Sequence, residues 1–140
     1  MNIFAKMKIA FDKRRKERKL KRLKLYLPLY CKIHGVTLGD RQGALAQTRA
    51  GDRLQAVHVP LPNYPYNIYI YSIPLNRVLG YLQEDLSEKL VKAFGENFCR
   101  DAVAENLTGE GYDYFGCNIC IFDRTSYIDG EINFQALRGE

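Results

Sequence analysis

Tyrosine is the residue type in this chain whose number and spacing most suggest binding chemistry. Five of the ten tyrosines lie in the 21 residues from Pro62 to Leu82. They are Tyr64, Tyr66, Tyr69, Tyr71 and Tyr81. Tyrosine rings at this density either fill a β core or form a surface on which a flat ligand such as a nucleobase stacks. The sequence around them has to decide between these two roles.

Basic residues are the second feature with chemical potential. Residues 1–25 contain eleven Lys or Arg and two acidic residues (+9), whereas residues 26–140 contain ten basic and fourteen acidic residues (−4). Three interpretations are open for this arm: a solubilising extension, a phosphate-binding segment for nucleic acid, or a contact with an anionic membrane surface. The basic residues assigned to phosphate contacts are Lys13, Arg14, Arg15, Lys16, Arg18 and Lys19.

Cys117 and Cys120 form a C-x-x-C pair, which raises the question of zinc or redox chemistry. The pair lies in F-G-C-N-I-C-I-F, which reads as a strand, and residues three apart on a strand point to opposite faces. We therefore expect buried or half-buried, reduced thiols and no metal or other cofactor. The only histidines are His34 and His58, and no nucleophile has a base placed beside it by the sequence, so we expect no enzyme activity.

The length of 140 residues suits one domain with an appended segment. No run approaches the roughly 20 apolar residues of a membrane span, and no signal peptide is visible. These features predict a cytoplasmic protein without integral membrane association. The expected organisation is a basic helical or disordered arm (1–24), a β domain (25–123) and a loosely ordered tail (124–140).

The β domain should contain five or six short strands and one main helix, an α+β pattern that is mainly β and typical of a small barrel. Strands are expected at 25–37, with its first half on a sheet edge because of Pro28, and where Ile68 and Ile70 alternate with Tyr69 and Tyr71. The other expected elements are a helical turn at 41–47, a helix at 83–94, and strands at 53–59, 78–82, 98–108 and 112–122.

Five short motifs in this order resemble the HIRAN domain family. They are G-V-T-L-G-D-R-Q (35–42), R-A-G-D-R-L (49–54), N-Y-P-Y-N (63–67), L-G-Y-L (79–82) before the helix, and Y-F-G-C-N-I (114–119). The resemblance covers about residues 29–122. It implies an OB-like β-barrel, either standing alone in bacteria or fused to helicases and nucleases, that captures the 3′-hydroxyl end of single-stranded DNA.

The resemblance assigns roles to individual residues. Tyr66 matches the family tyrosine that stacks on the terminal base, with Tyr64 beside it. Asn67 either replaces the following family aspartate or, after a two-residue deletion that the later spacing favours, matches a later asparagine. The family's Arg-Tyr pair falls at Thr37 and Leu38.

Arg41 or Arg77 could take the place of the family arginine. The resulting hypothesis is a non-catalytic module that binds nucleic acid, preferably single-stranded DNA or DNA ends, and works with a DNA-processing protein. The alternative is a protein-interaction scaffold that makes no contact with nucleic acid.

Overall fold

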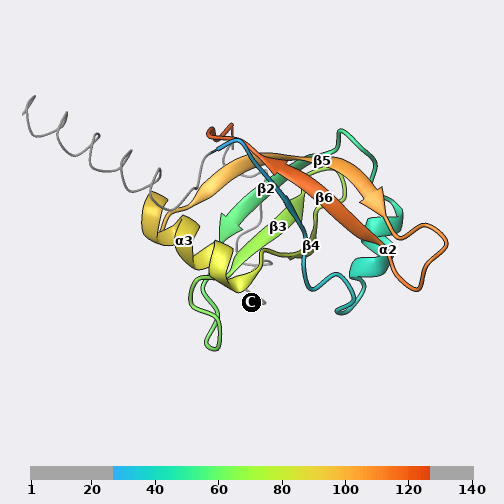
Figure 1. Cartoon of the computed structure of the whole chain (residues 1–140), viewed down its shortest axis with the longest axis horizontal. Helices are drawn as coiled ribbons and strands as arrows, with labels where there is room; N and C mark the ends of the chain where they lie inside the picture. Colours follow the sequence, from blue (N-terminus) through green and yellow to red (C-terminus); the bar gives the residue numbers. More distant parts are fainter. Residues whose placement is uncertain (1–26, 127–140) are drawn as a thin grey trace, which may run out of the picture.

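The computed structural model describes residues 27–126, which form a mainly β structure with two short helices (Figure 1). The basic arm and residues 127–140 of the predicted tail lie outside the described residues. The elements are β1 (Leu29–Lys32), α2 (Arg41–Ala46), β2 (Arg53–His58), β3 (Ile68–Ser72), β4 (Arg77–Tyr81), α3 (Glu84–Phe94), β5 (Cys99–Thr108) and β6 (Gly116–Ile121).

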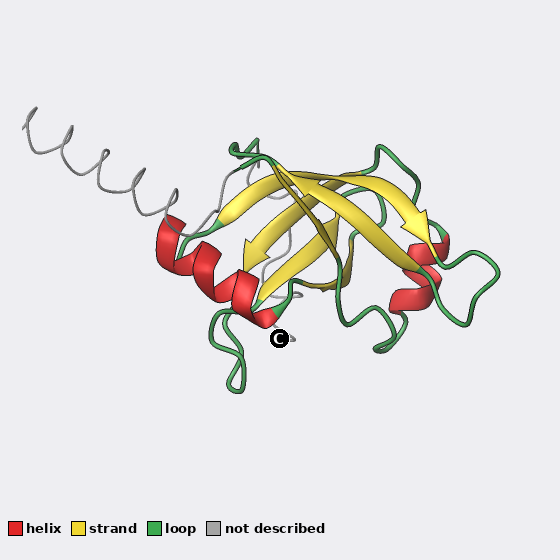
Figure 2. Cartoon of the chain, viewed as in Figure 1, coloured by secondary structure: helices red, strands yellow, loops and turns green. Residues whose placement is uncertain are grey.

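The six strands form one antiparallel sheet in the order β1-β6-β5-β2-β3-β4 (Figure 2). β1 is an edge strand, as Pro28 predicted. The sheet curls into a half-barrel, and its two edges meet at one residue pair. There His34 N–H donates to Tyr81 O at 2.8 Å and Tyr81 N–H donates to His34 O at 3.0 Å.

The two sheet edges pair at one residue pair only, because the chain turns away directly after His34. Gly35 has a φ of 65°, which glycine tolerates and other residues rarely adopt. The strand expected at 25–37 is therefore only four residues long, and the expected barrel is observed as a curled half-barrel. The mainly β class, the strand number and the single main helix are confirmed.

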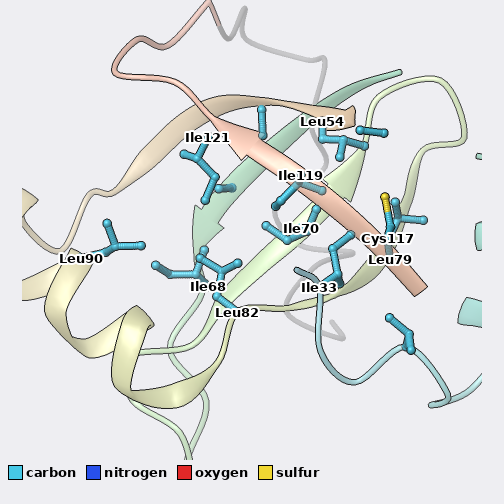
Figure 3. Packing of buried hydrophobic residues seen from close by; sticks show 14 of the residues in the cluster. Ile33, Leu54, Ile68, Ile70, Leu79, Leu82, Leu90, Cys117, Ile119 and Ile121 are labelled. Atoms are coloured by element: carbon cyan, nitrogen blue, oxygen red, sulfur yellow. The ribbon is translucent and has the colours of Figure 1, made fainter. Parts of the chain in front are cut away.

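The main hydrophobic cluster fills the concave side of the sheet. Figure 3 shows Ile68 and Ile70 from β3 meeting Ile119 and Ile121 from β6, with Leu90 of α3 beside them. A second, smaller cluster lies on the opposite face and contains Val57, Val59 and Tyr71, with Tyr69 and Val78 packed against it. β3 thus has apolar contacts on both faces, as its sequence predicts.

α3 begins and ends where the sequence places its boundaries. The Gln83 side chain accepts a hydrogen bond from Leu86 N at 3.1 Å and caps the first turn, which carries Glu84 and Asp85. Gly95, with a φ of 106°, ends the helix. Neither helix within residues 27–126 is long and apolar enough to cross a membrane.

Candidate nucleic-acid interface

Arg41 lies between two tyrosine rings on adjacent strands. Tyr69 of β3 pairs directly with Tyr81 of β4, and the Arg41 guanidinium carbon is 5.9 Å from each ring centroid. Its Nη1 donates to Gly35 O at 2.8 Å. Cation–π contacts of this kind contribute about 0.5 to 1 kcal/mol each at exposed sites. Arg41, predicted as a nucleic-acid-binding residue in place of the family arginine, is thus already engaged in joining the start of α2 to the β3–β4 hairpin.

Tyr64 bridges the loop before β3 and the start of α3. Its hydroxyl donates to Leu82 O at 2.9 Å, and its ring meets Tyr81 edge-on at a centroid distance of 6.1 Å. Burial raises the pKa of Tyr64 above its ordinary value, and this outweighs the opposing hydrogen bond with Ser87. The ring is only partly buried, so part of its surface remains available to a ligand.

Tyr66 packs against the main hydrophobic cluster at the edge of α3. Lys92 Nζ lies 5.4 Å from the ring centroid and also pairs with Glu88 Oε1 at 2.8 Å. This ion pair raises the pKa of Lys92. A base that stacked on the same ring face as Lys92 would have to displace the ammonium group.

Asn67 is fully buried, in contrast to the surface position expected for a nucleic-acid ligand. Its Nδ2 donates to Val59 O at 3.1 Å, and its backbone N–H donates to Tyr64 O at 3.1 Å. Its side chain holds the 60–67 loop on β2 rather than facing solvent. His58 supports the same loop, because its ring nitrogens lie 2.7 Å from Glu96 O and 2.8 Å from Pro65 O.

Among the predicted site residues within 27–126, Arg77 is the one most accessible to a phosphate. Its side chain is 52 % exposed, and Nη1 lies 2.9 Å from Asp40 Oδ2, whose side chain is 78 % exposed. Exposed ion pairs of this kind contribute at most about 1 kcal/mol, so a phosphate could compete with Asp40. The structure places Arg41 and Arg77 near the same α2–β4 junction, because Arg41 directly follows Asp40.

The six arm residues predicted to bind phosphate, Lys13, Arg14, Arg15, Lys16, Arg18 and Lys19, lie outside the described residues. The described residues carry nine Lys or Arg and eleven Asp or Glu, a formal charge of −2. Most of the positive charge that a polyanion would require therefore belongs to the arm.

A groove that the sequence did not predict lies between the turn after β1 and the β5–β6 loop. Its volume is about 640 Å³. Tyr112 and Tyr114 line it and are 85 % and 57 % exposed. Lys32 and residues 33–37 form the opposite wall. Figure 1 shows the β5–β6 loop in orange, close to α2.

Gln42 of α2 holds both walls of this groove. Its Nε2 donates to Val36 O at 2.8 Å and to Phe115 O at 2.9 Å, and its Oε1 accepts from Phe115 N at 2.7 Å. Gly109 shapes the loop, since a Cβ there would clash with the Tyr114 carbonyl oxygen. The groove is therefore set by the fold, while its tyrosine rings are exposed.

The groove continues toward the predicted tyrosines through Gly35. Gly35 lines the groove, and a Cβ at this position would collide with the Tyr81 ring. Tyr81 in turn contacts Tyr64. The groove therefore borders Tyr81 through Gly35, and Tyr81 borders Tyr64; we refer to Tyr112, Tyr114, Tyr81 and Tyr64 together as the aromatic path. The sequence predicts a strand at 112–122, but the strand begins only at Gly116, and Tyr112 and Tyr114 lie in the Gly-rich loop before it.

Cys117 and Cys120 are buried free thiols, and Cys31 and Cys99 are half-buried free thiols. Cys117 shares the main cluster with Ile119 and Ile121, so Cys120, three residues from Cys117 on the strand, points to the other face. Burial raises the pKa of Cys31 to about 12 and that of Cys117 to about 11, which keeps both protonated. No group of three or more metal-ligating side chains occurs within residues 27–126.

No protein-family model, curated protein or solved structure matches this chain.

Proposed function

We propose that the protein is a cytoplasmic, non-catalytic module that binds single-stranded nucleic acid, with DNA or DNA ends as the preferred ligand. The observation that carries the proposal is the pair of exposed tyrosines, Tyr112 and Tyr114, on a groove with Lys32 at its other wall. A base of any sequence offers a flat face for such rings.

The arrangement supports a strand that enters the groove and follows the aromatic path past Tyr81 to Tyr64. Arg77 would exchange Asp40 for a phosphate, and the arm would supply most of the remaining positive charge. The motif resemblance to HIRAN domains, and an OB-like interpretation of the curled sheet, support the same class of ligand. A DNA-processing protein is the expected partner.

Fluorescence anisotropy with labelled single strands tests this function. Tyr112→Ala and Tyr114→Ala should each weaken binding about 5- to 150-fold, because a stacked base contributes about 1 to 3 kcal/mol. Tyr30→Ala is the matched control, since Tyr30 is 70 % exposed but is not among the residues that line the groove. The proposal fails if the unmodified chain does not bind single strands at low salt, or if all three variants bind equally well.

A protein-interaction module is the second candidate, and the exposed apolar residues around β1 favour it. Tyr30 and Leu38 are 70 % and 53 % exposed, and β1 presents an edge of the sheet. An edge strand can pair with a strand from a partner. In that case Tyr30→Ala and Leu38→Ala should reduce capture of the partner, whereas Tyr112→Ala should leave nucleic-acid affinity unchanged.

A further inference from the structure

The His58 ring joins two segments that are distant from each other in the sequence. His58 is the last residue of β2, and its Nδ1 lies 2.7 Å from Glu96 O in the turn after α3. Its Nε2 lies 2.8 Å from Pro65 O in the 60–67 loop. Figure 1 shows this loop in green at the end of β2, beside α3. The imidazole therefore bridges the loop and the α3–β5 turn.

Both groups that face the ring nitrogens are carbonyl oxygens, which can only accept hydrogen bonds. A neutral imidazole has one N–H donor and one bare nitrogen, whereas the imidazolium has two N–H donors. Only the imidazolium can therefore donate to Pro65 O and Glu96 O at the same time. In the neutral form a nitrogen lone pair would face an oxygen lone pair, and that contact would be lost.

The surroundings of the ring leave the two carbonyl oxygens as its principal partners. His58 forms no ion pair within residues 27–126. Glu96 and Cys99 line the same pocket as His58, and burial raises the pKa of the Cys99 thiol, which keeps it neutral. The 60–67 loop and β3 contain no charged residue. Charged side chains on the neighbouring α3 and β5 form pairs of their own: Lys92 with Glu88, and Arg100 with Asp123.

The remaining backbone contacts of the loop lie at its ends and within it. Val59 N–H donates to Asn67 O at 2.9 Å, and Asn67 Nδ2 donates to Val59 O at 3.1 Å. Leu61 and Tyr64 exchange two backbone hydrogen bonds inside the loop, at 3.0 and 3.1 Å. The His58–Pro65 contact ties the second half of the loop to the α3–β5 turn, so its loss would loosen the loop without opening the sheet.

We propose that His58 is a pH-sensitive switch on the 60–67 loop: the imidazolium holds the loop and the α3–β5 turn together, and loss of one ring proton releases one of them. Histidine is the side chain whose charge ordinarily changes between about pH 5 and 8. Both hydrogen bonds are therefore present at the acid end of this range, and one is lost as the pH rises.

The switch also bears on the nucleic-acid site, a consequence that rests on the proposed function. Tyr64 belongs to the 60–67 loop and is the last member of the aromatic path. A loop held by the imidazolium keeps this ring in place beside Tyr81. Binding of single strands should therefore be tighter when His58 is protonated.

Nuclear magnetic resonance of the full chain tests the switch. Isotope-edited spectra of the His58 ring should show protons on both nitrogens at about pH 5.5 and on one nitrogen at about pH 8. The backbone amide signals of Tyr66 and Asn97 should shift over the same pH interval, because their nitrogens are bonded to the Pro65 and Glu96 carbonyl groups.

Two variants show whether these shifts come from His58. His58→Gln should abolish the pH-dependent shifts of Tyr66 and Asn97, because a glutamine amide has no proton to lose in this range. His34→Gln is the matched control, since it removes the only other histidine of the chain and should keep the shifts. A His58 ring whose number of protons does not change with pH would overturn the proposal, and so would pH-dependent shifts that persist in His58→Gln. If this variant does not fold, the ring and amide signals of the unmodified chain decide alone.

Fluorescence anisotropy at the same two pH values tests the consequence for binding. The loss of single-strand affinity between the lower and the higher pH should be larger for the unmodified chain than for His58→Gln. Equal losses would overturn the regulation of the site by the switch. A chain that binds no strand at either pH would contradict the proposed function, whereas the spectra of the His58 ring still decide the switch.

Discussion

Gln42 and Phe115 exchange two hydrogen bonds although 73 positions separate them in the sequence: Gln42 Oε1 accepts from Phe115 N at 2.7 Å, and Gln42 Nε2 donates to Phe115 O at 2.9 Å. The same Nε2 also donates to Val36 O. The amide thus pairs with the chain at the start of β6 in the way that a neighbouring strand would, and it fixes the width of the groove.

Gln42→Ala should lower the free energy of unfolding by about 1 to 3 kcal/mol, because it leaves partly buried backbone groups of Val36 and Phe115 without partners. It should also weaken binding of single strands, because the side chain that joins Val36 to Phe115 no longer holds the two walls of the groove together. Gln42→Glu keeps the acceptor for Phe115 N but loses the donor for both carbonyl oxygens, so it should also be destabilised. Urea unfolding and anisotropy measure the two effects. Unchanged stability in both variants would contradict the role of the amide.

Gly80→Ala should prevent the two sheet edges from meeting. A Cβ at Gly80 would clash with the His34 carbonyl oxygen and the Ile33 side chain, where the sheet edges are joined. Overpacking of this kind typically costs about 1 to 3 kcal/mol. Gly43→Ala is the matched control, because nothing lies within 4 Å of its Cβ position in α2 and alanine favours helix by up to about 1 kcal/mol. Thermal unfolding should therefore shift in opposite directions for the two variants.

Asp101 should make stability depend on pH in the acid range. Burial by itself raises its pKa, but hydrogen bonds from Ser126 and Gln55 outweigh burial and place the pKa below the ordinary value of 3.8. A folded-state pKa below the unfolded one gives stability that is present above pH 3.8 and is lost as the pH falls through the folded value.

Asp101→Asn should therefore reduce the free energy of unfolding at pH 7, and its difference from the unmodified chain should shrink as the pH falls below 3.8. Asp123→Asn is the control, because its side chain is 64 % exposed and lies 3.6 Å from Arg100 Nε. Urea unfolding over a series of pH values measures both. A difference that did not change with pH would contradict the assignment.

Cys31 and Cys117 should be unreactive in the folded protein. The thiolate is the nucleophile, and the raised pKa values of Cys31 and Cys117 leave almost no thiolate at pH 8.5. Iodoacetamide followed by mass spectrometry of peptides should find these two positions unmodified in native buffer and modified in urea. Rapid native alkylation of Cys117 would instead indicate an accessible, activated thiol.

The sequence predicted the elements with a regular period and missed contacts that depend on the assembled fold. The alternation of Ile68 and Ile70 with Tyr69 and Tyr71 predicts β3. The acidic first turn and Gly95 predict the two ends of α3 to within a residue or two. The burial of Asn67 depends on Val59 from the preceding strand, and no local pattern signals it. The sequence predicts a strand at 112–122, whereas Tyr112 and Tyr114 lie exposed before β6. Whether a tyrosine ring in a loop is exposed depends on the surrounding fold, and no local sequence pattern indicates it.

The salt dependence of single-strand binding should distinguish phosphate contacts made by the arm from base stacking in the groove. Replacing Lys13, Arg14, Arg15, Lys16, Arg18 and Lys19 by glutamine should flatten the slope of log affinity against log salt by up to about 4, since each phosphate contact to a single strand contributes about 0.7. Lys32→Gln should lower the slope by about 0.7. Tyr112→Ala should reduce affinity at every salt concentration and leave the slope unchanged, because stacking releases no counterions. Anisotropy titrations from 50 to about 200 mM salt measure all three, and an equal slope for the arm variant and the unmodified chain would show that the arm does not contact phosphates.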